Sequence, residues 1–285
     1  MIQLDELIKS AQELDPLPAS VTRLASLVAS ENSDLAQIQR VVELDPALTG
    51  RLLKTANSAA SAAVHPITTV RAAVMRLGSG AVLSLATATA VHGRMSTSVP
   101  EYGLGEGDLW HHALTAALAA ENWARLAKVS VPPECFTAAL LHDIGKLVLG
   151  RFLKPEVRAV LGEAMQEAHL SPLRAEMEVL GVHHAELGGL IAQNWKLPET
   201  IVAGITFHHD PNGVAESTWA GRPDVQAICD TVHLADATAY AVAEGTAPSP
   251  MDQSSLGRLG LSTEQFAEVV EKTREQVQGV LAVYK

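Results

Sequence analysis

The sequence is poor in aromatic residues and in cysteine, and each shortage narrows the kind of protein it can encode. Phe, Trp and Tyr make up 4% of the 285 residues, so aliphatic side chains must fill most of the core. The two cysteines, Cys135 and Cys229, form neither a CxxC motif nor a disulfide framework. This usage fits a reduced protein, and we expect it to be cytoplasmic.

Positive charge is also scarce, because 21 lysine and arginine residues face 32 aspartate and glutamate residues, for a formal net charge of -11. Binding to nucleic acid or to an anionic membrane surface needs clustered basic side chains, and no such cluster is present. No apolar run reaches the roughly 18 residues of a membrane span. The N-terminal MIQLDELIKSAQ lacks the apolar core of a signal peptide. We therefore expect no nucleic-acid partner and no membrane.

The residues that are abundant favour helices. Apolar residues recur at three- and four-residue spacing through most of the chain, and no convincing pair of alternating strands is found. Asp45 before Pro46 is typical of a helix start, with an N-cap followed by proline at the first helical position. Gly78 and Gly80 interrupt the apolar segment 67–91, which predicts two helices that meet at a turn. The expected fold class is all-α.

Two breaks divide the chain. STSVPEYGLGEGD and EGTAPSPMDQSS replace periodic apolar residues with proline, glycine and acids. The predicted parts are an N-terminal helical half, a linker, a histidine-rich helical half, and a C-terminal linker with one helix, at residues 1–95, 96–108, 109–245 and 246–285. We expect 17–91 to form a compact layer without a site of its own. Residues 14–18 carry two prolines and should be extended.

Histidine is distributed unevenly, since nine of the eleven lie in the histidine-rich half. They are His111 and His112, His142, His169, His183 and His184, His208 and His209, and His233. Any one of them alone is more often a surface residue or a hydrogen-bonded core residue than a ligand. Three adjacent pairs and one His-Asp doublet at predicted helix edges favour a shared metal site, because imidazole and carboxylate are transition-metal ligands.

Acidic residues are placed where they could complete such a site. Asp108 lies four residues before His112, so the two can share a helix face. Asp236 lies among small apolar residues in VHLADATAYA. We expect His111, His183 and His233 to support the ligands or to lie at the surface. A plainer alternative stays open, in which the His pairs decorate helix ends and His142 and Asp143 form a buried hydrogen-bonded pair.

The order of a histidine, a His-Asp doublet in ALLHDIGKL and a distant aspartate resembles the HD superfamily of metal-dependent phosphohydrolases. The segments DPALTGRLLKTANSA and ITTVRAAVMRLG resemble the HDOD domain, a relative of that superfamily associated with signalling. The resemblance spans about residues 17–236. It implies an HD-superfamily-like helical bundle preceded by a packed N-terminal helical subdomain, and it implies a regulatory role.

The order of the candidate ligands is similar to that of the HD-GYP branch, which hydrolyses cyclic dinucleotides at a site with two or three metal ions. The resemblance implies the metal ligands His112, His142, Asp143, His184, His208, His209 and Asp236, with Asp108 as an extra acidic ligand. Lys146 matches a lysine near the substrate phosphate, so Asp143 and Lys146 are the candidate catalytic residues. After the His pair the chain reads FHHDPNGVAEST, without the Gly-Tyr-Pro signature of that branch.

Two functions therefore remain open. One is a signalling module that keeps a site for divalent ions, expected to be two in number and drawn from iron, manganese, nickel and zinc. Its partner would be a signalling protein or a small phosphorylated ligand. The other is an active metal-dependent phosphohydrolase, in which the metal pair activates water, Asp143 bridges the ions and Lys146 stabilises phosphate charge.

Overall fold

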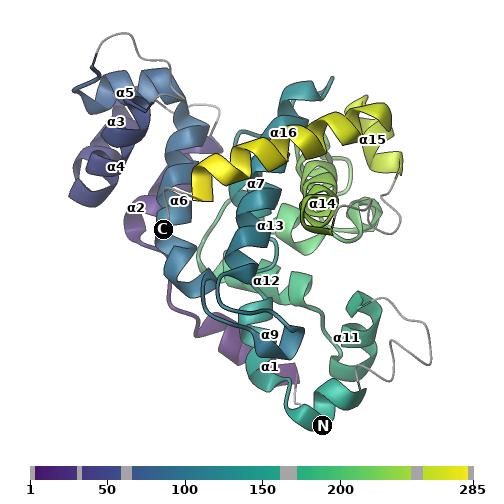
Figure 1. The fold of residues 1–285 in the computed structure, drawn as a ribbon. Coiled ribbons are helices and arrows are strands. Elements are labelled where there is room, and N and C mark those ends of the chain that lie inside the picture. Colours follow the sequence, from purple (N-terminus) through teal and green to yellow (C-terminus); the bar gives the residue numbers. More distant parts are fainter. Residues whose placement is uncertain (1–3, 31–33, 59–65, 161–171, 245–252, 282–285) are drawn as a thin grey trace.

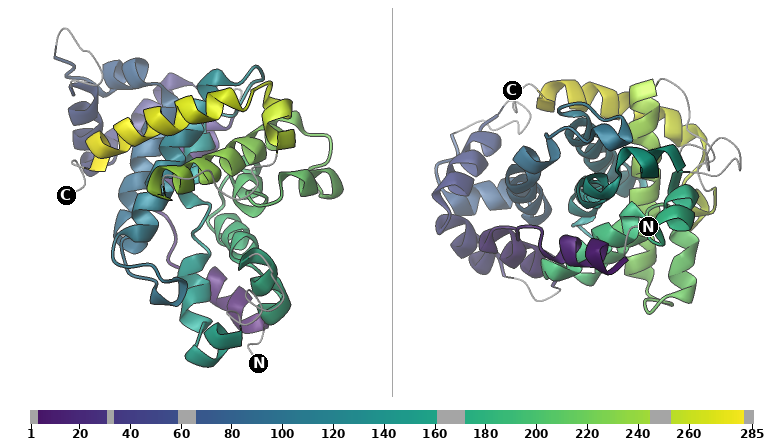
Figure 2. Two further views of the ribbon diagram at one scale, coloured as in Figure 1. Left: turned by 45° about the vertical axis from the view of Figure 1, so that its right-hand side comes forward. Right: turned by 90° about the horizontal axis from the view of Figure 1, so that it is seen from below.

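A computed structural model describes residues 4–30, 34–58, 66–160, 172–244 and 253–281 of the chain (Figure 1). Helices dominate these residues, and the described part of the chain holds no strand, only an isolated bridge between Val99 and Leu104. The predicted all-α class is confirmed. The helices form two groups, which Figure 2 shows from two further sides.

The first group follows helix starts that the sequence encodes. Asp34, Asp45 and Thr69 each accept a hydrogen bond from a backbone amide in the first helical turn, and Pro46 opens its helix as predicted. The helices of this part are α1 (Leu4–Gln12), α2 (Ala19–Val28), α3 (Leu35–Glu43), α4 (Pro46–Ala56), α5 (Val70–Leu77) and α6 (Ser79–Met95).

The predicted turn between α5 and α6 lies at Gly78, whose φ of 86° is unfavourable for residues with a side chain. The two helices meet there at an angle of 104°. Together this bent pair has the length and apolar character of a span, whereas no single helix among the described residues is long and apolar enough to cross a membrane.

Helix α1 does not pack in the layer formed by α2 to α6. Of the predicted segment 14–18, Leu14 lies in a bend and residues 15–18 are outside any helix; the segment leads away from α1, which packs on α12 and α9 in the histidine-rich half (Figure 1). Asn194 donates a side-chain hydrogen bond to the Gln12 carbonyl (2.7 Å), and the Trp195 indole donates to the Leu14 carbonyl (3.4 Å). The N-terminal segment therefore connects both groups of helices.

The second group is arranged around two long helices, α7 and α14, which make the most extensive helix contact among the described residues. Its helices are α7 (Asp108–Leu126), α8 (Cys135–Leu141), α9 (Lys146–Phe152), α11 (Pro172–Leu180), α12 (His184–Asn194), α13 (Glu199–Thr206), α14 (Pro223–Glu244), α15 (Gln253–Leu259) and α16 (Glu264–Leu281). The Trp123 indole joins α7 to Thr238 of α14 (3.0 Å), and Asn122 joins α7 to Thr273 of α16 (3.1 Å).

The two predicted breaks differ in outcome. Residues 96–107 connect α6 to α7 and contain a short 3-10 turn, η2 (Pro100–Tyr102). Within the second break, residues 245–252 lie outside the described residues. The part after it holds two helices, α15 and α16, where one was predicted. The backbone amide of Ser262 donates to the Gln265 side chain (2.9 Å), which is one of the two hydrogen bonds of a capping box before α16.

The two groups share a core along α6. Val82, Leu83 and Ala86 of α6 are buried, and α6 packs on α7 and α8. A side chain at Gly80 would come within 3.0 Å of the Pro133 carbonyl oxygen, so the start of α6 lies directly on the loop before α8. The N-terminal half thus covers the outer face of the helices that carry the site.

A protein that begins at Asp108 should be less stable and less soluble than the full chain. It would expose the faces of α7 and α8 that α6 covers, and each buried aliphatic side chain contributes about 1.5–3 kcal/mol. Thermal unfolding and the soluble yield after expression measure the effect. A well-folded fragment with the melting temperature of the full chain would contradict it.

Candidate metal centre

Seven of the predicted ligands converge on one place from five parts of the second group. Each comes from the end or the inner face of a helix, so the packing of the bundle sets their separation. They are His112 on α7, His142 and Asp143 between α8 and α9, His184 on α12, His208 and His209 just after α13, and Asp236 on α14. The structure thus brings these seven predicted residues together.

The first group of ligand atoms joins α7, α8 and α14. His112 Nε2 lies 3.2 Å from His142 Nε2 and 3.0 Å from Asp236 Oδ1. His142 Nε2 is 3.4 Å from the same Asp236 oxygen. Ligand atoms bonded to one ion at about 2.0–2.1 Å are about 2.8–3.4 Å apart in octahedral or tetrahedral geometry, so these three atoms have the spacing of a metal site.

The second group joins α12 to the end of α13. His184 Nε2 lies 3.0 Å from His209 Nε2. One ligand atom each from His184, His208 and His209 lies within 4.8 Å of the others. A group of three imidazoles suits a transition metal better than calcium or magnesium, which prefer oxygen.

Asp143 lies between the two groups and faces both. Its Oδ2 is 3.4 Å from His142 Nε2 and 3.7 Å from His112 Nε2, while its Oδ1 is 3.3 Å from His184 Nε2. A carboxylate can bind two ions with its two oxygens. The position of Asp143 therefore matches the bridging role that the resemblance implied.

Two polar atoms in the cluster also lack hydrogen bonds. Asp143 Oδ1 and His208 Nε2 are buried, and neither has a hydrogen-bond partner. Leaving a buried polar atom unpaired costs about 1–3 kcal/mol, and more for a charged group. Because both atoms point to the same cluster, a bound cation would satisfy them together, and the residues present fit a metal.

In three of the histidines, the Nδ1 atom forms a hydrogen bond with a neighbouring group. The Nδ1 atoms of His142 and His208 donate to the carbonyls of Ala139 (2.6 Å) and Ile205 (2.7 Å), each three residues earlier. His184 Nδ1 donates to Glu176 (2.8 Å). These bonds turn Nε2 of each ring toward the cluster, as is usual for histidines that bind metals.

Glu176 and Tyr102 were not predicted. Glu176 on α11 is buried and accepts hydrogen bonds from the ring and the backbone amide of His184, and its other oxygen accepts from the Tyr102 hydroxyl (2.9 Å). In the sequence LRAEMEVL it looks no different from Glu178, which is exposed. The three-dimensional position of α11 distinguishes them, and no local pattern does.

The remaining predicted residues lie around the cluster. His183 caps α12 by accepting from the Glu186 amide (3.3 Å), and His233 donates to the carbonyl of His208 (2.7 Å). His111 is exposed on α7. The first two thus support residues of the cluster or its helices, as expected, and the third lies at the surface.

The charges in the cluster shift its pKa values in opposite directions. Burial alone would raise the pKa of Asp143, but Lys146, 2.6 Å away, and His142 outweigh it and hold the pKa well below its usual range. Burial lowers the pKa of His209 to about 3 and that of His208 well below its ordinary value. Burial also opposes a charge on His142, yet Asp143 and Asp236 raise its pKa to about 10.

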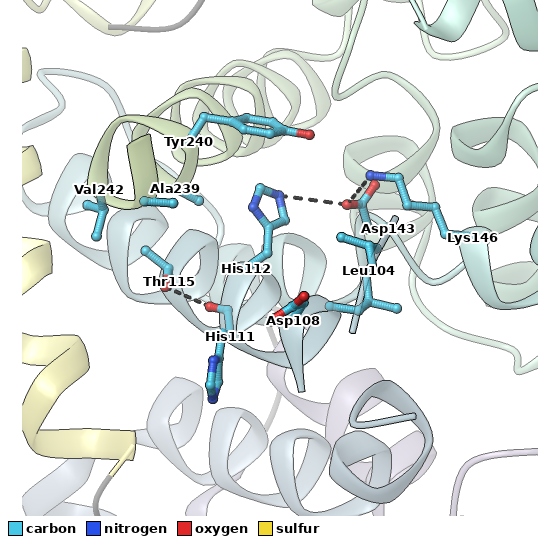
Figure 3. Close-up of a pocket in the computed structure, with 12 residues that line it drawn as sticks. Leu104, Asp108, His111, His112, Thr115, Asp143, Lys146, Ala239, Tyr240 and Val242 are labelled. Carbon is cyan, nitrogen blue, oxygen red and sulfur yellow. Dashed lines mark hydrogen bonds and ion pairs between the residues drawn. The ribbon is translucent and has the colours of Figure 1, made fainter. Parts of the chain in front are cut away.

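A cavity of about 420 Å³ opens beside the first group (Figure 3). His112, Asp143 and Lys146 line it together with apolar residues of α7 and α14, and Tyr240 lies over His112 with a ring separation of 4.8 Å. Among the described residues, no residue of α1 to α6 lines this cavity.

Asp108 lines the same cavity, but the structure does not bring it into either group of ligand atoms. Its Oδ2 accepts a hydrogen bond from the backbone amide of Gly105 (2.7 Å). The Asp108 carboxylate at the start of α7 thus stabilises the preceding turn. The four-residue spacing from His112 placed it on the correct side of α7 but did not foresee this competing partner.

Glycine at position 145 is needed for the cluster to form. A Cβ there would lie 1.9 Å from the backbone oxygen of His184, so the turn after Asp143 rests directly on α12. Gly145→Ala should destabilise the protein by about 1–3 kcal/mol and lower its metal content, because the backbones must separate. Chemical unfolding and elemental analysis measure both.

Gly50→Ala is the matched control, since Gly50 is in a helix with nothing within 4 Å of the added carbon. It should keep the metal content and leave stability unchanged or raised by about 0.5–1 kcal/mol. Equal metal content in the Gly145→Ala protein and the wild type would show that this close approach does not position the ligands.

Comparison with known proteins agrees with this architecture. A solved HDOD domain protein of unknown function from Geobacter sulfurreducens is 22% identical, with a TM-score of 0.69 over 96% of this chain and 98% of that one. A candidate phosphohydrolase from Shewanella amazonensis is 26% identical, with a TM-score of 0.64 over 94% and 93%.

An uncharacterized protein of Treponema pallidum is 26% identical over 267 residues, which are 92% of this chain and 50% of that protein. The chain thus spans about half the length of this curated relative. The HDOD domain family matches residues 14–211, more than half of the sequence. The chain belongs to the HDOD domain family.

Proposed function

We propose that this chain is a regulatory HDOD module that binds two divalent metal ions at the seven-residue cluster. The observation that carries the proposal is the placement of Asp143, with one oxygen toward each group of ligands and one of those oxygens without a hydrogen bond. A buried histidine and aspartate that served only to stabilise the fold would be expected to satisfy each other, which is the plainer alternative.

The ligands divide between two ions. His112, His142 and Asp236 would hold one, His184, His208 and His209 the other, and Asp143 would contact both. Imidazole and carboxylate together suit iron, manganese, nickel and zinc. Bound there, such ions would polarise phosphate oxygens and lower the pKa of a coordinated water.

The cavity beside the cluster supports a small phosphorylated ligand. Lys146 lines it as a point cation next to Asp143, and Tyr240 offers a partly exposed ring at its edge. Lys146 would attract and orient the phosphate, while the apolar wall from α14 would receive the rest of the ligand. A change of ligand or metal occupancy would then be passed to a signalling partner.

Hydrolysis is the second candidate, and one observation favours it. The cavity reaches the cluster itself, so a ligand held by Lys146 would lie against the ions. The candidate phosphohydrolase from Shewanella amazonensis, 26% identical, supports the same chemistry. Cyclic dinucleotides are expected to be poor substrates, because Asp210 after the His pair starts a 3-10 turn, η3 (Pro211–Glu216), in place of a Gly-Tyr-Pro segment.

Protein purified without chelator or added metal should contain about two transition-metal ions per chain. Asp143→Ala should lose most of that metal, since both ions lose a ligand. Lys146→Ala should keep it, because a lysine cation is not a ligand. Elemental analysis of the three proteins tests this, with circular dichroism to verify folding. Metal-free wild-type protein that also fails to take up added iron, manganese, nickel or zinc would refute the proposal.

If the ions keep an open position, the protein should hydrolyse a generic phosphodiester or phosphomonoester slowly and only with metal bound. Lys146→Ala should reduce the rate by about 100-fold to 1,000-fold, the usual effect of removing one donor aimed at the charge that develops in the reaction. Turnover per bound metal is the quantity to measure, with Asp143→Ala as the background. Equal rates in the wild type and Asp143→Ala would assign the activity to a contaminant and leave the regulatory function alone.

A further inference from the structure

A second cavity, of about 670 Å³, lies apart from the metal centre. It is lined by the end of α2, the loop of residues 129–134, the first turns of α13 and α14, and the end of α15. None of the seven candidate ligands lines it. The cavity therefore lies where the N-terminal half meets the histidine-rich half.

The charged side chains that line this cavity are mostly acidic. They are Glu134, Asp224 and Asp230, with Arg258 as the basic one. Asp230 is fully buried and is paired with Arg258, whose Nη2 lies 2.5 Å from Oδ1 and whose Nε lies 2.8 Å from Oδ2. Asp224 is paired with Arg222 (2.5 Å). These two acids already have their partners.

Glu134 is the acid whose partners are incomplete. It is 2% exposed, and its Oε1 accepts a hydrogen bond from the Thr200 hydroxyl (2.5 Å). Its Oε2 is buried and has no hydrogen-bond partner. Native proteins rarely leave a buried carboxylate oxygen in this state, because the desolvation cost is not recovered. A donor that entered the cavity and met Glu134 would recover it.

The chemistry of that donor follows from the surroundings. A metal ion is disfavoured, since among the described residues no group of three ligand atoms lies at this cavity and Asp230 is committed to Arg258. An anion would face an acidic lining. A cation with N–H groups fits, because charge-assisted hydrogen bonds from guanidinium or ammonium to carboxylate are the strong ones.

The cavity also adjoins the far ends of the helices that carry the metal ligands. Glu134 immediately precedes α8, and His142 and Asp143 immediately follow it. Thr200 lies in the first turn of α13, which ends just before His208. At 1.5 Å per residue, the seven residues of α8 separate the two sites by only about 10 Å. A ligand that displaces Glu134 and Thr200 would therefore shift α8 and α13, which carry residues of both groups of metal ligands.

We propose that this cavity is an effector site for a small organic cation that carries N–H donors, such as a guanidine or an alkylamine. Glu134 is its recognition residue, and Thr200 positions the carboxylate. The site differs from the metal centre in place, charge and ligand class.

The test uses the full chain and isothermal titration calorimetry with agmatine, spermidine and arginine as probes. Citrulline is the control ligand, because it has nearly the shape of arginine without the guanidinium charge. We expect saturable binding of one probe or more, with arginine at least about tenfold tighter than citrulline if it is the one bound. No binding by any of the three cations, or equal binding of arginine and citrulline, would overturn the proposal.

Glu134→Gln keeps the shape of the side chain and removes its charge, so it should weaken binding of the cation by about tenfold or more. Glu216→Gln is the matched control, since Glu216 is exposed and lies outside the cavity. It should bind as the wild type does. Unchanged affinity in a folded Glu134→Gln protein would show that the cation binds elsewhere.

The effector role has its own measurement. Coupling between two sites is reciprocal, so the affinity for the cation must differ between metal-loaded and chelator-treated protein. Equal affinities would overturn the effector role. Binding to chelator-treated protein does not depend on the metal proposal, so failure of one proposal is distinguishable from failure of the other.

Discussion

The carboxylate of Asp143 is the group around which the site is organised. It is almost wholly buried, next to Lys146 on one side and four imidazoles on the other. Burying such a charge is tolerable only with close compensation, and Lys146 together with His142 supplies it. The turn that carries Asp143 must also lie against the backbone of α12, which glycine at position 145 permits. The electrostatic compensation and the close packing on α12 thus both constrain residues 143–146.

The bundle meets this constraint by using helix ends. His142 ends α8, His184 begins α12, and His208 follows α13, so three of the rings are carried by backbone whose polar groups are not all committed to a helix. Backbone carbonyls near those ends accept the Nδ1 protons of His142 and His208. The same irregular backbone that places the rings therefore also orients them.

Much of this could be predicted from sequence because it is local. Asp45 and Pro46 start a helix, Gly78 ends one, and adjacent histidines at helix edges mark the cluster. The family resemblance added the order of the ligands. What could not be predicted depends on contacts distant in sequence.

Glu176 reaches His184 because of the position of α11, and Asp108 accepts a hydrogen bond from the Gly105 amide. The packing of α1 on α12 was likewise not encoded in its own residues, since an amphipathic helix has an apolar face wherever it finds a partner. The position of a helix in space, more than its existence, is what the sequence leaves open.

The hydrogen bond between Tyr102 and Glu176 has a consequence for how such chains recombine. Tyr102 belongs to the segment between the two helical groups, yet through Glu176 it supports the ring of His184, and its own ring lies 5.8 Å from the Lys146 ammonium. The connecting segment is therefore part of the second group in a physical sense. A chimaera that exchanged N-terminal halves between homologues would keep an intact centre only if its junction fell before Val99. The turn that contains Tyr102 would then come from the same homologue as Glu176 and His184.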